Sequence, residues 1–125
     1  FVATVNLTCA VLPAMVEADG GTVIVSGATA SVRGGAKFAA FASAKAGLRS
    51  LTQSLAREYG PKGVHVAHVI LDGIIDTEAS RERHSLSPDR MMTPQDIADV
   101  YLTLARQPKS TWTHELDLRP MGESF

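Results

Sequence analysis

Two groups of side chains in this sequence are suited to binding and polarising a small molecule. Hydroxyl groups occur at Ser26, Thr29 and Ser31, within a stretch of small residues rich in glycine. An ammonium group occurs at Lys45, four residues after Phe41 and therefore on the same face of a helix. Hydroxyl and ammonium groups donate hydrogen bonds to oxygen atoms, so these positions are the first candidates for chemistry in the chain.

Each of these features also has a purely structural explanation. Lys45 could be a surface lysine whose aliphatic stem covers apolar neighbours. Thr29 could cap a loop with its hydroxyl, and the glycine-rich stretch 26–37 could be a plain connector. The residue types alone do not decide between binding and structure.

A metal site is not expected from the histidines. His65 and His68 are three residues apart on a predicted strand, which directs them to opposite faces of a sheet. Ligands of one metal ion must converge on a single point, so this pair is a poor candidate.

The elements that must position the site alternate between helical and strand patterns. Apolar spacing and turn residues predict, in order, a helix over 1–15, a strand over 22–25, a helix over 38–59, a strand over 64–71, a helix over 94–106 and a strand over 112–118. Strands joined through helices pair in parallel, so the sequence predicts an α/β fold. The charged segment 77–92 is expected to be a loop with room for a short helical turn. Ligands of such sheets bind beyond the carboxyl ends of the strands, here after Val25, Leu71 and Leu118.

Composition limits the classes of partner. The 125 residues carry 12 basic and 13 acidic side chains, with no basic cluster that would indicate nucleic acid or a membrane surface. No apolar run is long enough to cross a bilayer, so a cytoplasmic protein is expected. Its one cysteine, Cys9, is expected to be a small core residue in a reducing compartment.

The predicted long helix contains Phe38-Ala-Ala-Phe41-Ala-Ser-Ala-Lys45, which resembles the Tyr-x-x-x-Lys helix of the short-chain dehydrogenase/reductase family. Further segments resemble the same family in the same order, namely Gly21–Ser31 with the strand and serine loop, Leu51–Val64 with the helix ending, Leu71–Thr77 with the Pro-Gly-x-x-x-Thr segment, and Thr93–Ala98 with a later helix start. The resemblance covers nearly the whole chain and implies the C-terminal half of a Rossmann-like, doubly wound parallel sheet.

The resemblance also implies a function. The family transfers hydride between a nicotinamide cofactor, NAD or NADP, and a carbonyl or alcohol substrate. Lys45 would hold the nicotinamide ribose, and Gly73, Ile74, Ile75 and Thr77 would contact the nicotinamide end of the cofactor. Homo-oligomers, dimers or tetramers, are expected by the same likeness.

Three departures from the family pattern bear on catalysis. Phe41 stands where the family has its acid/base tyrosine, and a phenyl ring has no exchangeable proton. Ala28 stands at the family's serine position, which leaves Thr29 as the nearest hydroxyl, and Asp72 replaces the proline of Pro-Gly. The alternative to an impaired or rewired oxidoreductase is therefore a non-catalytic relative that works by binding or assembly.

The dinucleotide-phosphate half of the family site is expected to lie outside these residues. The chain contains no Gly-x-Gly-x-x-Gly motif and begins with Phe1 in an apolar stretch. We expect residues 1–125 to form one domain without that half, and to leave a hydrophobic sheet edge open. Asn6 resembles the family's water-relay asparagine, but the short spacing to Ser26 favours an asparagine bonded to its own helix.

Overall fold

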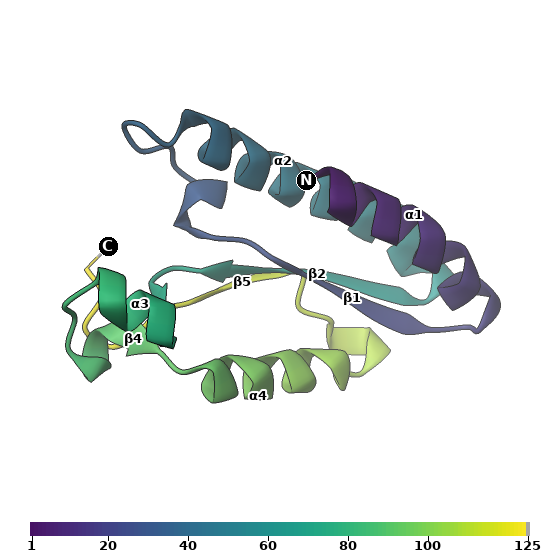
Figure 1. The fold of residues 1–125 in the computed structure, drawn as a ribbon. Helices are drawn as coiled ribbons and strands as arrows, with labels where there is room; N and C mark the ends of the chain where they lie inside the picture. The colour runs from purple at the N-terminus through teal and green to yellow at the C-terminus, as the bar shows by residue number, and fades with distance from the viewer. Residues whose placement is uncertain (125) are drawn as a thin grey trace.

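In the computed structural model, which describes residues 1–124, a parallel sheet lies between two layers of helices (Figure 1). Helices α1 and α2 cover one face of the sheet, and α4 covers the other. The helices are α1 (Val2–Glu17), α2 (Ala39–Tyr59), α3 (Glu78–Arg83) and α4 (Pro94–Ala105), with short 3₁₀ turns η1 (Thr29–Ser31), η2 (Gly60–Lys62), η3 (Pro88–Arg90) and η4 (Lys109–Thr111). The strands are β1 (Gly21–Ser26), β2 (Val64–Leu71), β3 (Ile74–Ile75), β4 (Met91–Met92) and β5 (Glu115–Leu118).

The main sheet has the strand order β1-β2-β5, with both pairs parallel. Its central strand β2 is buried from Val64 to Ile70, as expected for a parallel strand covered on both faces. Within residues 1–124, β1 and β5 each have a neighbour on one side only. The predicted parallel α/β architecture is confirmed.

Local sequence explains where the helices begin and end. The Thr93 hydroxyl accepts a hydrogen bond from the Asp96 N–H over 3.2 Å, and Pro94 occupies the first turn of α4. Helix α2 ends at Tyr59 before Gly60 and Pro61, and Gly63 then takes a left-handed φ of 87° that turns the chain into β2.

The hydrophobic core lies between the α1 and α2 layer and the sheet. One cluster of its buried side chains consists of Leu12 of α1 and Val64 and Val66 of β2. Partly buried side chains that pack against these three are Met15, Val16, Val23, Leu55, Ala56 and Tyr59. No helix among residues 1–124 combines the length and the hydrophobicity needed to cross a bilayer.

Burial along α1 differs from the sequence expectation, and α2 buries few of its residues. Cys9 is exposed rather than in the core, because α1 buries the stripe through Thr8 and Leu12 and the next position points outward. Helix α2 lies on the surface and buries only Ala42, Leu48 and Thr52. Its alanines do not make it a buried helix.

The C-terminal third contains more regular structure than the sequence predicts. Segment 77–92, expected as a loop with room for a short helical turn, contains the six-residue helix α3, but its end also forms β4, which pairs in parallel with β3. The last strand starts at Glu115 rather than 112, because the 3₁₀ turn η4 ends just before Trp112, whose indole stacks on the His65 ring with centroids 4.9 Å apart. Asn6 is exposed on α1, and no side-chain bond from it to the described residues supports the expected local contact.

Candidate active site

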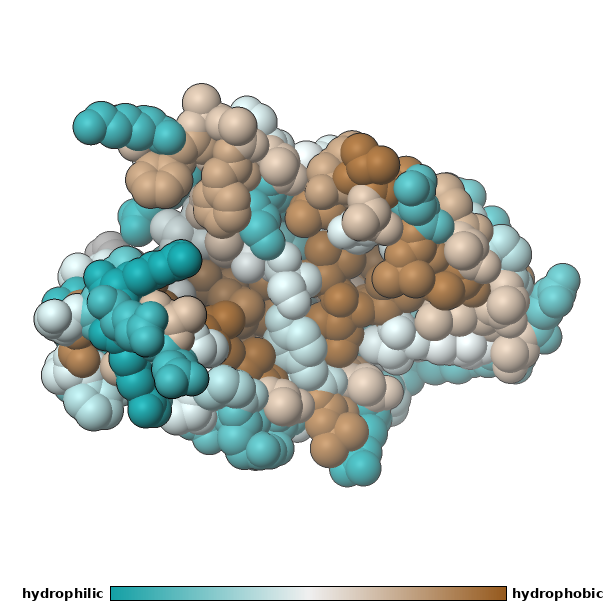
Figure 2. All heavy atoms as spheres, in the orientation of Figure 1, coloured by the Kyte–Doolittle hydropathy of each residue, from teal (hydrophilic) through white to brown (hydrophobic). Residues whose placement is uncertain are grey.

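The segment after β1, the end of β2 and the start of α2 meet around one cavity of about 390 Å³. Its lining residues are Ala28, Thr29, Ala30, Arg33, Gly34, Gly35, Phe38, Phe41, Leu71, Gly73 and Ile74. Figure 2 shows a hollow at this place, between the segment that leads into α2 and the region of α3. The cavity therefore lies beyond the carboxyl ends of two parallel strands, where ligands of α/β sheets bind.

Lys45 reaches from α2 to the end of β1. Its Nζ atom donates a hydrogen bond to the main-chain oxygen of Ser26 over 3.1 Å. The same nitrogen lies 5.9 Å from the centroid of the Phe41 ring, one helical turn earlier. The lysine therefore stands beside the cavity wall, in a neighbouring groove of about 500 Å³ that follows the open edge of β1.

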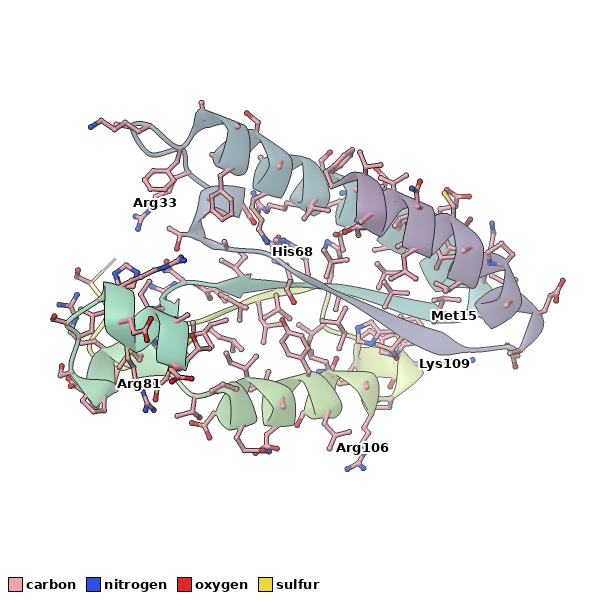
Figure 3. All side chains as sticks on the ribbon, in the orientation of Figure 1. Met15, Arg33, His68, Arg81, Arg106 and Lys109 are labelled. Carbon is pink, nitrogen blue, oxygen red and sulfur yellow. The ribbon has the colours of Figure 1, made fainter. Side chains whose placement is uncertain are left out.

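The walls of the cavity are largely apolar. Phe38 and Phe41 line it, and these two residues are 60% and 50% exposed. Arg33 is the only charged residue among those that line it. Figure 3 shows the Arg33 side chain extending from the loop before α2 on the side that faces α3.

Thr29 is the hydroxyl residue of η1 that lines the cavity. Its Oγ1 donates a hydrogen bond to Oδ1 of Asp72, a buried residue at the end of β2. The other carboxylate oxygen, Oδ2, lies 3.6 Å from Nη2 of Arg119. Ala28, at the predicted serine position, contributes to the cavity without a hydroxyl.

The predicted cofactor residues after β2 divide into two groups. Gly73 and Ile74 line the cavity, whereas Ile75 and Thr77 do not. The Thr77 hydroxyl caps α3 by accepting a hydrogen bond from the Ser80 N–H over 3.1 Å. Gly73 packs against Pro120, since a Cβ atom here would lie 2.6 Å from the proline Cδ.

The backbone N–H and C=O groups of Ile75 point away from β4, the strand that pairs with β3. The Asp76 N–H donates to the Met92 carbonyl over 2.8 Å, so residues 74 and 76 turn their polar groups toward β4. Alternate residues of a parallel ladder face opposite sides, and the N–H and C=O of Ile75 consequently point away from β4. They form a donor and acceptor pair suited to an amide.

A charged cluster that the sequence did not predict holds α2 to the sheet. Arg49 of α2 donates two hydrogen bonds to Glu115 of β5, at 2.8 and 2.7 Å. Glu115 also contacts Nδ1 of His68, at 2.9 Å. His68 lies on β2 and is fully buried. Figure 3 shows His68 between α2 and the sheet.

The cluster shifts the protonation equilibria of its members. Hydrogen bonds from Arg49 lower the pKa of Glu115 to about 2, and the Glu115 contact raises the pKa of Arg49. Burial lowers the pKa of His68, and Glu115 opposes this only in part. His68 and Glu115 are register partners across β2 and β5, a relation that no local sequence signal reveals.

Residues 1–87 match the sequence profile of the short chain dehydrogenase family. The chain belongs to this family. An uncharacterized short-chain type dehydrogenase/reductase of Sinorhizobium fredii is 29% identical over 112 residues, which cover 80% of this chain and 44% of that protein. A 3-oxoacyl-[acyl-carrier-protein] reductase of Pseudomonas aeruginosa is 40% identical over 77 residues, which cover 62% of this chain and 31% of the relative.

Solved structures of short-chain dehydrogenases share the fold. One from Rhodopseudomonas palustris is 44% identical, with a TM-score of 0.66 over 85% of this chain and 41% of that one. A serine dehydrogenase in complex with NADP+ has a TM-score of 0.84 over 97% of this chain and 52% of its own, and at 23% identity this likeness shows the fold alone. The chain spans less than half the length of the curated relatives it matches.

Proposed function

We propose that the protein is a nicotinamide-dependent oxidoreductase that acts on a small carbonyl or alcohol substrate. The substrate would bind in the cavity that lies between η1, the start of α2 and the end of β2. The observation that carries the proposal is the position of Lys45, whose Nζ lies 3.1 Å from the end of β1 and one helical turn from the cavity wall at Phe41. This site belongs to a chain of the short-chain dehydrogenase family.

The donors present suit the nicotinamide end of NAD or NADP. An ammonium group has three donors, and the Ser26 carbonyl takes one from Lys45, which leaves two for the hydroxyls of a ribose. The outward N–H and C=O of Ile75 would bind the carboxamide. When bound, the nicotinamide supplies or accepts the hydride. This chain's residues hold and orient it.

The cavity indicates the chemistry of the substrate. Phe38 and Phe41 offer apolar ring faces, which favour an alkyl or aryl body. Arg33 offers a guanidinium group, which binds a carboxylate or phosphate in bidentate fashion. A carbonyl or alcohol compound with an anionic group therefore fits best.

A non-catalytic role is the second candidate, and Phe41 is the observation that favours it. The phenyl ring occupies the wall next to Lys45 and has no proton to exchange. Such a protein would retain nucleotide binding without turnover.

The test measures binding and turnover separately. The purified protein is titrated with reduced and oxidised NAD and NADP by calorimetry, and hydride transfer is followed with a panel of anionic and neutral carbonyls and alcohols. We expect binding that Lys45→Met weakens and that Lys62→Met, at the exposed η2 lysine, leaves unchanged. Binding without any turnover would support the second candidate, and no binding would contradict both.

A further inference from the structure

A buried carboxylate contacts the hydroxyl of Thr29, a residue of the cavity wall. Thr29 lines the cavity and donates its hydroxyl proton to Oδ1 of Asp72. Asp72 is only 8% exposed and is not among the residues that line the cavity. Thr29 therefore stands between this carboxylate and any substrate in the cavity.

The hydrogen bond has a direction that matters for chemistry. A hydroxyl has one proton and two lone pairs. Because a carboxylate only accepts, the Thr29 proton is directed at Asp72 and the lone pairs of Oγ1 remain free to accept a proton from a substrate hydroxyl. The second carboxylate oxygen faces Arg119 at 3.6 Å, which balances its charge in the interior.

We propose that Asp72 is the proton acceptor of this site and acts through the Thr29 hydroxyl, in place of the phenol that Phe41 lacks. This inference rests on the proposed oxidoreductase function. It assigns Thr29 as the residue that touches substrate and Asp72 as the residue that positions and drives the transfer.

The step balances in the direction of alcohol oxidation. The substrate O–H bond breaks as its proton passes to Thr29 Oγ1, and the Thr29 proton passes to Asp72 Oδ1. The substrate carbon loses hydride to an oxidised nicotinamide dinucleotide and becomes a carbonyl carbon. In the reverse direction, a protonated Asp72 returns the proton through Thr29 to the carbonyl oxygen.

Other groups near the cavity are less suited to this role. The Phe41 ring carries no exchangeable proton, and a threonine hydroxyl is too weak a base to accept a proton unless a partner takes its own proton. Ser31 directs its Oγ toward the Ala28 N–H, at 3.0 Å, and serves the η1 turn. Asp72 is the carboxylate that contacts a hydroxyl of the cavity wall.

The test compares variants that keep the geometry but change the chemistry. Asp72→Asn retains an oxygen that accepts from Thr29 but cannot take a proton, and we expect kcat to fall about 10²- to 10⁴-fold with nicotinamide binding unchanged. Thr29→Val should lower kcat by a similar factor, and Thr29→Ser should keep most of the activity. Asp117→Asn removes the other carboxylate that pairs with Arg119 and controls for lost ion pairing.

Two further readouts separate proton transfer from structure. Formate should restore part of kcat in Asp72→Ala with saturation, because a small acid can occupy the vacated carboxylate position. In the cofactor-free protein, the carboxyl carbon resonance of Asp72 should move in Thr29→Val and stay in place in Thr29→Ser.

The outcomes are distinct. Full activity in Asp72→Asn, with turnover in the parent, would overturn the relay and leave the oxidoreductase proposal standing. A loss in Asp72→Asn that Asp117→Asn reproduces, without rescue of Asp72→Ala by formate, would assign Asp72 to structure alone and overturn the relay. A parent that turns over no substrate would overturn both proposals together.

Discussion

The Nζ atom of Lys45 and the main-chain oxygen of Ser26 lie 3.1 Å apart, which ties the surface of α2 to the end of β1. We expect Lys45→Met to lower the affinity for nicotinamide cofactor about 10- to 100-fold, since one or two hydrogen bonds to a charged donor are lost. The bond to Ser26 is exposed, so the free energy of unfolding should change by less than about 1 kcal/mol. Calorimetric titration and urea unfolding check the two parts, and equal cofactor affinity in the variant would contradict the assignment.

A phenol restored at residue 41 should increase activity. Phe41→Tyr places an exchangeable proton on the cavity wall one helical turn from Lys45, and we expect kcat to rise about tenfold or more. Phe38→Tyr is the matched control, because it adds a phenol to the same cavity at another exposed ring. Equal effects of the two changes on initial rates would argue against a specific position for the proton.

Substrate preference should depend on Arg33. Arg33→Gln removes the only charge among the cavity-lining residues, and we expect KM for anionic carbonyl compounds to rise about 10- to 100-fold. Neutral analogues of similar size should keep their KM within about threefold, because they make no ion pair. Steady-state kinetics with matched acids and amides measures the difference, and a parallel change for both would remove Arg33 from substrate recognition.

Stability should fall at mildly acid pH because of His68. Its pKa is lowered from 6.5 by burial, so the unfolded chain binds a proton that the folded chain excludes, and stability decreases as pH falls below 6.5. Between about pH 7.5 and 5.5 the parent should lose more unfolding free energy than His68→Asn, with a limiting slope of about 1.4 kcal/mol per pH unit for one proton. Urea unfolding at both pH values checks this, with His84→Asn, an exposed histidine, as the control.

Glu115 acts in a lower pH range. Its pKa falls from 4.5 to about 2 on folding, so its contribution is present above 4.5 and is lost as pH falls toward 2. The loss of unfolding free energy at mildly acid pH is therefore assigned to His68. A parent and a His68→Asn variant with the same pH dependence would contradict that assignment.

Gly27 should not tolerate a side chain. A Cβ atom here would collide with Nε2 of His68 and lie 2.7 Å from its Cε1 and 2.8 Å from the Ser31 Oγ, and the fully buried ring cannot move aside. We expect Gly27→Ala to destabilise the protein by about 1–3 kcal/mol. Gly20→Ala, where the added methyl meets open space, should have little effect, and similar melting temperatures for the two variants would contradict the packing argument.

The sequence by itself determined the parallel α/β fold and the position of Lys45 relative to Phe41. Helix spacing fixes two residues four apart on one face, and apolar runs between helices leave few alternatives to a parallel sheet. The same local information was insufficient for Cys9 and for β3 and β4. The apolar spacing along α1 does not show which face is buried, so it did not place Cys9 on the exposed face. Strands β3 and β4 are only two residues long, which is too short for a periodic pattern.

Only the tertiary structure decided which distant residues meet. The contact between Thr29 and Asp72 joins residues 43 positions apart, and the pair His68 and Glu115 joins residues 47 positions apart. Both contacts depend on the order and register of strands in the sheet, which arise from packing of the whole chain. A hydroxyl in a glycine-rich loop and an aspartate after a strand are ordinary in sequence, and they become a candidate proton relay because β1 and β2 end side by side.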